Sequence, residues 1–153
     1  MKKLLFSPLF IIICYLLIPS FAFAQSATEV EELLSMDALS YEEAVWFVMR
    51  VAEIPDVSGP AEAFSFAAER KWLPARALPD GKAKLNGISL LIMRSFELKG
   101  GFLYTCTKSP HHAYRELTYK GIIQGRTAPN SDVSGDLLLY MTGNLLSLTE
   151  NEL

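Results

Sequence analysis

Apolar and polar residues follow one another along residues 25–153 with the spacing of amphipathic helices. Ser40 and Glu43 have the spacing of a capping box at the start of one such segment. Pro60 and Pro110 suit the first turn of two others, because the amide that proline lacks would have no partner there. The pattern predicts helices over residues 29–36, 40–54, 60–71, 87–98, 110–120 and 135–148. We therefore expect an all-α protein.

The same order of residues occurs twice, first in residues 60–98 and again in residues 110–146. The first part of the duplication is Pro60, Ala63, Phe64, Arg76 and Pro79, repeated as Pro110, Ala113, Tyr114, Arg126 and Pro129. After a slightly shorter loop, the second part is Gly87, Leu90, Leu91 and Met93, repeated as Gly135, Leu138, Leu139 and Met141. A duplication of this length indicates a repeated helix-loop-helix bundle, an architecture that commonly binds along a shared surface.

The duplication divides residues 39–148 into a partial unit, 39–58, and two complete repeats, 60–98 and 110–148. The partial unit is assigned because Met49-Arg50 stands in its helix as Met93-Arg94 stands in the first repeat. Residues 25–38 are expected to be a leader with a short helix. Residues 100–109 lie between the repeats, and the loose alternation in Phe102–Thr107 permits a short extended segment there.

Residues 1–24 have the features of an export signal. Lys2 and Lys3 precede a long apolar stretch, and Ala22-Phe23-Ala24 before Gln25 fits the small-x-small rule of signal peptidase. The sequence therefore predicts an exported protein of the bacterial envelope, periplasmic or otherwise extracytoplasmic, with no membrane segment after cleavage. The apolar stretch is also long enough for an uncleaved anchor, which remains the alternative.

Charge and cysteine content exclude some partners. The formal net charge is −3, and the predicted signal contains no acidic residue, so the remainder is acidic too. An acidic exported domain is a poor partner for nucleic acid. Cys106 is the one cysteine after the signal, so an internal disulfide is excluded, and we expect a half-buried, unreactive thiol there.

The arrangement resembles the S-layer homology (SLH) family. Its module is a helix with alanine and aromatic positions, a loop with proline, and a second helix of the form Leu-Leu-x-x-Arg-x-x-x-Leu. The matching pieces here are Ala63-Phe64, Trp72-Leu73, Pro79-Asp80 and Leu90–Leu98, then Ala113-Tyr114, Gly121-Ile122-Ile123, Pro129 and Leu137-Leu138. The resemblance covers roughly residues 39–148.

The resemblance implies three modules in a bundle that anchors a protein noncovalently to cell-wall polymers, with ligand held in grooves between modules. The family's second helix begins Thr-Arg-Ala-Glu, and its arginine helps to hold an acidic glycan. This chain has Leu85-Asn86-Gly87-Ile88 and Val133-Ser134-Gly135-Asp136 there instead. The repeated Gly87 and Gly135 indicate close helix packing at this corner.

Two arginines at equivalent loop positions, Arg76 and Arg126, are the leading ligand-binding candidates. Arginine can hold a carboxylate or phosphate with two parallel hydrogen bonds, although a structural role on loop carbonyls also explains the repeat. Four further candidates have simple structural alternatives. They are Trp72 (sugar stacking or core), Arg94 (ligand or salt bridge), and Tyr114 and Arg115 (ligand or a solvated helix face).

The sequence offers no catalytic or metal-binding constellation. Adjacent residues of a helix point about 100° apart, so His111 and His112 are poorly placed to share a metal ion. Nucleophile elbows and phosphate loops are absent from the sequence. We therefore expect a nonenzymatic protein without a cofactor or metal.

Three hypotheses follow for function. The leading one is an exported module that binds peptidoglycan or another cell-wall glycan. The alternative is a structural module that docks an envelope protein or forms a homo-oligomer, because an incomplete first unit leaves a helix face without its partner. The third, least favoured, is a small hydrolase with Glu116 or Asp132 as its acid, which would require a desolvated pocket.

Overall fold

The computed structural model describes residues 28, 30–55, 57–125 and 127–151. The predicted signal peptide, residues 1–24, and Arg126 lie outside this part of the chain. The chain divides into two units, residues 1–35 and 36–153. The described part of the first unit contains a short helical segment, residues 30–34, where the sequence predicted a short helix.

The second unit contains six helices within the described residues. They are α3 (Tyr41–Val51), α4 (Pro60–Glu69), α5 (Leu85–Ser95), α6 (Phe102–Thr107), α7 (Pro110–Tyr119) and α8 (Gly135–Asn151). The described part of the chain has two isolated antiparallel bridges, Ser40 with Lys82 and Lys84 with Asp132, and no strand. The all-α prediction is confirmed. The expected capping box of Ser40 and Glu43 is also present at the start of α3.

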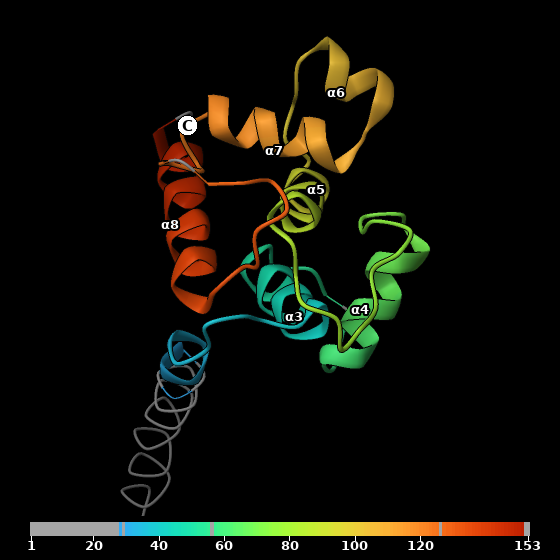
Figure 1. Cartoon of the computed structure of the whole chain (residues 1–153), viewed down its shortest axis with the longest axis vertical. Helices are drawn as coiled ribbons and strands as arrows, with labels where there is room; N and C mark the ends of the chain where they lie inside the picture. The colour runs from blue at the N-terminus through green and yellow to red at the C-terminus, as the bar shows by residue number, and fades with distance from the viewer. Residues whose placement is uncertain (1–27, 29, 56, 126, 152–153) are drawn as a thin grey trace, which may run out of the picture. The chain divides into compact units, whose positions relative to one another are not determined.

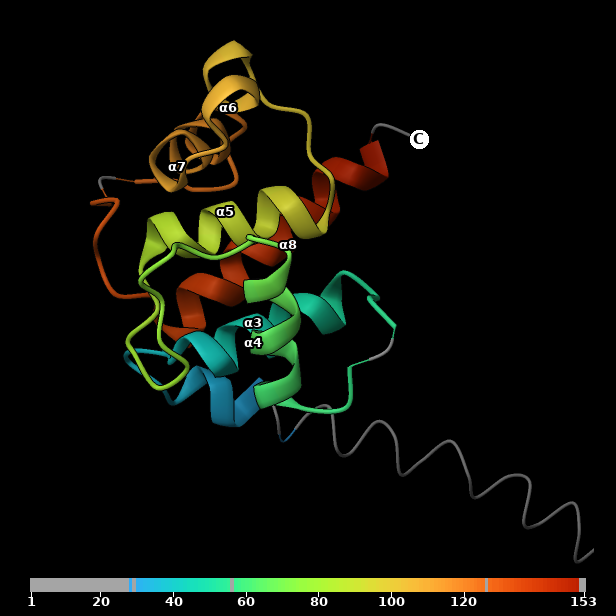
Figure 2. The ribbon, with the colours of Figure 1, turned by 90° about the vertical axis from the view of Figure 1, so that its right-hand side faces the viewer.

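Helices α3 and α5 lie side by side, and each carries a second helix on its outer side (Figure 1). Helix α4 packs against α3, and α7 packs against α5. The turned view shows α5 running across the molecule above α3, with α6 folded onto α7 (Figure 2). Helix α8 contacts α3. The apolar faces of α3, α5 and α8 therefore share one core.

The centre of this unit is a closed ring of backbone hydrogen bonds. Leu39 donates its amide to the Val133 carbonyl (2.8 Å), Val133 donates to Ala83 (2.9 Å), and Ala83 donates to Leu39 (2.8 Å). All three residues are fully buried. An unpaired backbone group would be costly there, so the ring satisfies the amide and carbonyl of each of the three residues at once. Each residue stands two positions before a helix.

The first amides of these helices donate to the same three segments, but in the opposite cyclic order to the ring. The Tyr41 amide of α3 donates to Gly81 (2.9 Å), and the Leu85 amide of α5 donates to Ser131 (3.0 Å). The Gly135 amide of α8 donates to Met36 (3.0 Å). The first amides of a helix have no partner within the helix, so each helix start depends on a loop from elsewhere in the chain.

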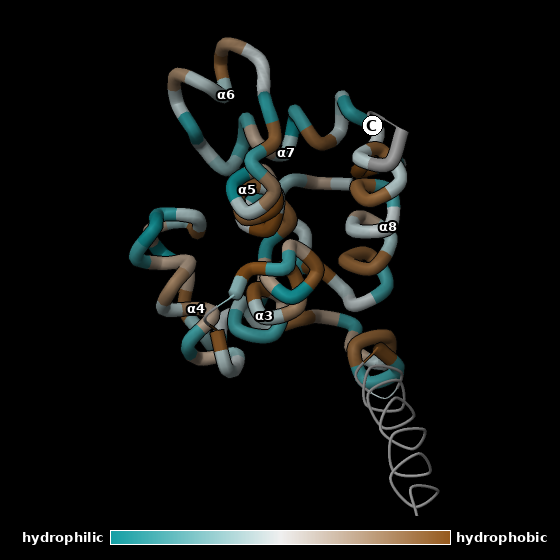
Figure 3. Tube along the Cα trace, turned by 180° about the vertical axis from the view of Figure 1, so that it is seen from behind, coloured by the Kyte–Doolittle hydropathy of each residue, from teal (hydrophilic) through white to brown (hydrophobic). Residues whose placement is uncertain are grey.

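Helix α5 is buried nearly all round, which explains its continuous apolar sequence. Leu85, Ile88, Leu91 and Ile92 are completely buried, and such side chains contribute about 1.5–3 kcal/mol each. The buried Ser89 hydroxyl donates to the Leu85 carbonyl at 2.7 Å, so no polar atom of this serine is left unpaired. Hydrophobic turns lie on α3, α5 and α8, while the chain at the end of α4 is hydrophilic (Figure 3).

The expectation of an extended segment at Phe102–Thr107 was wrong, because this segment is helix α6. Thr105 and Thr107 donate side-chain hydrogen bonds to carbonyls one turn earlier, and Lys108 ends the helix in the left-handed conformation. Tyr104 is the one buried residue among its six, so we infer that the burial of this side chain favours the helical over the extended conformation. Cys106 is exposed rather than half-buried, because α6 turns it to solvent.

None of the helices in the described part of the chain combines the length and the apolar character needed to cross a bilayer.

Two glycine substitutions test how tightly the start of α5 is packed. A Cβ at Gly87 would overlap the Tyr41 hydroxyl and press on Pro74, whereas a Cβ at Gly143 of α8 meets nothing. We expect Gly87→Ala to lower the free energy of unfolding by about 1–3 kcal/mol, since Tyr41 is buried and must shift. Gly143→Ala should leave it unchanged or raise it by up to about 1 kcal/mol. Denaturant unfolding measures both, and equal effects would contradict the close packing.

Candidate functional site

A groove of about 450 Å³ opens where the starts of α3 and α5 meet the loops before α5 and α8. Its polar lining consists of Tyr41, Arg76, Lys82, Lys84, Asn86 and Asn130. The close approach of Gly87 to Tyr41 sets one wall, because the missing side chain lets the tyrosine lie against α5. Pro74 and Pro110 contribute to the apolar part of the lining.

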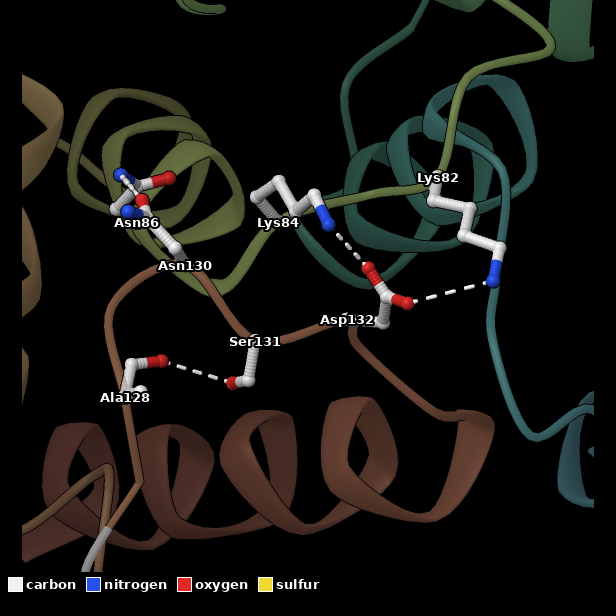
Figure 4. A network of polar contacts seen from close by, with 7 residues as sticks. All are labelled: Lys82, Lys84, Asn86, Ala128, Asn130, Ser131 and Asp132. Carbon is white, nitrogen blue, oxygen red and sulfur yellow. Dashed lines mark hydrogen bonds and ion pairs between the residues drawn. The ribbon is translucent and has the colours of Figure 1, made fainter.

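Two lysines of the groove share one carboxylate, as Figure 4 shows. Lys84 Nζ lies 2.5 Å from Asp132 Oδ1, and Lys82 Nζ lies 3.4 Å from Asp132 Oδ2. The lysine side chains are 67% (Lys82) and 44% (Lys84) exposed, so both ammonium groups remain accessible from solvent. Together with Arg76, the groove lining carries three cationic side chains, of which Lys82 and Lys84 pair with Asp132.

The loop before α8 is fixed to the start of α5 by a second polar contact in the same network (Figure 4). Asn86 Nδ2 donates to Asn130 Oδ1 at 3.0 Å, and the Ser131 hydroxyl donates to the Ala128 carbonyl at 2.8 Å. The expectation that this helix begins at Gly87 was wrong. Helix α5 begins at Leu85 because the loop carbonyls of Ser131 and Pro129 satisfy the amides of Leu85 and Asn86.

The Asp132 carboxyl is held in its charged form. The hydrogen bond from Lys84 is the largest cause and lowers the pKa of Asp132. Partial burial is the next largest and opposes it, and the charges of Lys84 and Lys82 with the hydrogen bond from Lys82 lower the pKa further, so the net shift is downward. Burial raises the pKa of the Tyr41 hydroxyl, while a backbone hydrogen bond from Lys84 and its charge oppose that rise. At neutral pH the groove therefore holds a neutral phenol and an ionised carboxylate.

The lowered pKa of Asp132 argues against its role as the acid of a hydrolase. A general acid must hold its proton at working pH, which requires a raised pKa. Asp132 has a lowered one, because two ammonium groups stabilise its charge. The other acid considered, Glu116, lies on α7 and is not among the residues that line the groove.

The predicted site residues fall in different places. Arg76 lines the groove. Arg126 is outside the described residues, so its predicted role stays a prediction. Trp72 and Arg94 come together at a different pocket, between the end of α5 and α6. Trp72 is also packed edge-to-face on Phe66, with ring centroids 5.8 Å apart.

Tyr114 and Arg115 lie on α7 away from the groove lining. The Tyr114 hydroxyl donates to the Thr127 carbonyl at 2.7 Å, which ties α7 to the following loop. This contact gives Tyr114 a structural role. Arg115 is exposed, and its predicted ligand role remains a prediction.

His112, one of the two adjacent histidines, contacts hydroxyl groups close to it in the chain. His112 Nδ1 lies 2.8 Å from the Thr107 hydroxyl and 2.9 Å from the Ser109 hydroxyl, at the turn between α6 and α7. Within the described residues, no group of three or more His, Cys, Asp or Glu side chains could hold a metal ion.

The sequence analysis did not predict that Lys82, Lys84 and Asp132 form one charged cluster. Their signal was the alternation Lys82-Ala83-Lys84, which places both lysines on one side of an extended segment and the buried alanine on the other. Their common partner Asp132 could not be identified from spacing, because it comes from a distant loop that the backbone ring brings alongside.

Comparison with protein-family models, with curated proteins and with solved structures found no match to this chain.

Asp132 lies closer to Lys84 than to Lys82, and this difference leads to a measurable prediction. Lys84→Met should raise the pKa of the Asp132 carboxyl toward the ordinary value of 3.8, because Lys84 is the largest cause of its depression. Lys82→Met should raise it less, since that contact is longer. Carboxyl carbon shifts followed by NMR against pH would report both values, and equal shifts would refute the assignment.

The lowered pKa of Asp132 also makes the free energy of unfolding depend on pH. A carboxyl whose folded pKa lies below 3.8 stabilises the folded state above that pH, and the contribution is lost as pH falls through the folded value. Asp132→Asn should therefore be less stable than the unmodified protein at pH 6, and the difference should shrink below about pH 4. A difference that persists at lower pH would contradict the argument.

Proposed function

We propose that this protein is a noncatalytic, exported module of the bacterial envelope that binds an acidic cell-wall glycan in the groove of Arg76, Lys82 and Lys84. The proposal rests on the presence of these three cations in the lining of one groove, where Asp132 pairs with the two lysines. An otherwise acidic chain with a net charge of −3 keeps this local excess of positive charge at a concave surface. Export itself rests on the sequence of residues 1–24.

The chemistry of the lining supports a sugar acid as ligand. Arg76 can bind a carboxylate through two parallel hydrogen bonds, and the lysines can add charge-assisted ones. Asn86 and Asn130 offer amide groups for sugar hydroxyls, and the Tyr41 ring offers a flat apolar face. A charged ring with several hydroxyl groups would use all of these.

We further propose that the fold is built from helix-loop-helix units arranged cyclically, as the SLH resemblance implies. Leu39, Ala83 and Val133 occupy equivalent positions before α3, α5 and α8, and their reciprocal hydrogen bonds support this. In this arrangement Asn86 stands where the SLH family has its glycan-binding arginine. Lys82 and Lys84, just before α5, would supply the positive charge in its place.

The second candidate function is docking to an envelope protein or to another copy of the chain. It is favoured by three large apolar side chains exposed on α6 and α7. These are Phe102 (80% exposed), Leu103 (54%) and Tyr119 (90%). Sedimentation velocity at micromolar concentration, with Phe102→Ser as comparison, would separate the two candidates. A monomer that binds no protein from the envelope would count against docking.

The glycan proposal is tested by co-sedimentation of the purified protein with peptidoglycan sacculi, with and without attached polymers. Arg76→Ala should weaken binding about tenfold, because a charge-assisted hydrogen bond is lost. The double variant Arg76→Ala with Arg126→Ala should abolish it, if Arg126 serves an equivalent groove. Binding should also weaken as salt is raised.

The matched control is Lys120→Ala, which removes one positive charge from the end of α7 and lies outside the groove lining. It should bind like the unmodified protein, and circular dichroism should show equal helix content in all variants. Equal binding by Arg76→Ala and the control would remove Arg76 from the site. Failure of the unmodified protein to sediment would refute the glycan proposal.

A further inference from the structure

A second pocket, of about 550 Å³, lies between the end of α5, the connection that follows it, and α6. It shares no lining residue with the groove of Arg76. Trp72, Met93 and Leu98 form its apolar part. Its charged and polar lining is Arg94, Glu97, Lys99, Tyr104, Thr105 and Lys108.

Two buried polar atoms of this pocket have no hydrogen-bond partner among the described residues. They are Arg94 Nε and the Tyr104 hydroxyl oxygen. Tyr104 is only 6% exposed, and its hydroxyl oxygen has almost no surface accessible to solvent. A buried donor without a partner costs about 1–3 kcal/mol. Folded proteins leave few such groups unpaired, and two of them lining one pocket is an arrangement that a ligand would satisfy.

The position of Tyr104 is set by the backbone before α6. A Cβ at Gly100 would overlap the Tyr104 ring, so the ring lies directly against this glycine. Burial raises the pKa of Tyr104, with the Arg94 charge lowering it and the Glu116 charge raising it. The phenol is therefore protonated at neutral pH and can donate a hydrogen bond, as can the Arg94 guanidinium.

The charges select a singly charged anion. Arg94, Lys99 and Lys108 exceed the single carboxylate of the lining, Glu97, so an anion is attracted. Glu97 in the lining and Glu116, close enough to influence Tyr104, would oppose a doubly charged phosphate. A carboxylate has two oxygens that can accept from Arg94 Nε–H and Tyr104 O–H. Trp72 and Met93 suit a ring or hydrocarbon attached to it.

We propose that the pocket between α5 and α6 is a binding site for a small carboxylate attached to a ring or short hydrocarbon, held by Arg94 and Tyr104. Such a group occurs on sugar acids and on aliphatic acids alike. The site is independent of the wall-glycan proposal, because the two use different residues.

The test follows Trp72 fluorescence in the full chain with Trp46→Phe, so that Trp72 is the reporting tryptophan. Glucuronate and hexanoate are the two probes, and glucose is the neutral control. At least one carboxylate should give a saturable change, and glucose should give none. Glucuronate alone would identify a sugar acid, and a response to both would identify the carboxylate as the recognised group. The Trp72 indole signal in NMR gives the same readout without the Trp46 substitution.

Tyr104→Phe separates binding from structure. It removes one hydroxyl and keeps the ring, so the carboxylate affinity should fall about fivefold with the loss of one hydrogen bond. Its melting temperature should be equal to or above that of the unmodified protein, because an unpaired buried hydroxyl is removed. Tyr119→Phe, at a 90% exposed position, should change neither quantity.

Two results would overturn the inference. One is the absence of a saturable response to either carboxylate, and the other is unchanged affinity in Tyr104→Phe. Lys84→Met, which alters the groove, should bind the carboxylates like the unmodified protein. Its failure to bind sacculi with retained carboxylate binding would show that the two sites are separate.

Discussion

Leu39, Ala83 and Val133 close a ring of three backbone hydrogen bonds in the fully buried centre of residues 36–153. Opening any one bond would leave an amide and a carbonyl unpaired away from water, so the three segments hold together or not at all. Each segment leads directly into α3, α5 or α8, so the ring also fixes where those three helices begin. The loop carbonyls that satisfy the first helix amides link the same three segments in the opposite cyclic order.

The groove is a consequence of this ring. Lys82 and Lys84 flank Ala83, one of the three buried residues of the hydrogen-bond ring. Their side chains therefore point outward and reach the same carboxylate of Asp132. The lysines and the aspartate belong to loops far apart in the chain, and their pairing costs only the ordering of the side chains, because the backbone is already fixed. Positive charge is thus concentrated at a rigid concave surface, where an acidic ligand can be recognised without rearrangement.

Helix α6 is the part least determined by its own sequence. Its six residues are too few for a stable isolated helix, and their composition is equally compatible with an extended segment. The burial of Tyr104 against Gly100 supplies the anchoring contact. That contact leaves the tyrosine hydroxyl unpaired beside Arg94 Nε. The local cost of these two groups is the reason to regard the adjoining pocket as a binding site rather than as a packing defect.

The sequence by itself determined the all-α class, the helix starts marked by Ser40, Pro60 and Pro110, and the apolar faces that form the core, because capping, first-turn proline and periodicity are local. It also named Arg76, which lines the groove, as a ligand-binding candidate, and that role stays a prediction. Only the tertiary structure decided that α5 begins at Leu85, that Phe102–Thr107 is helical, and that Asp132 serves two lysines. Each of these depends on a hydrogen bond or contact between segments distant in the chain, and no local pattern encodes which distant segment will supply it.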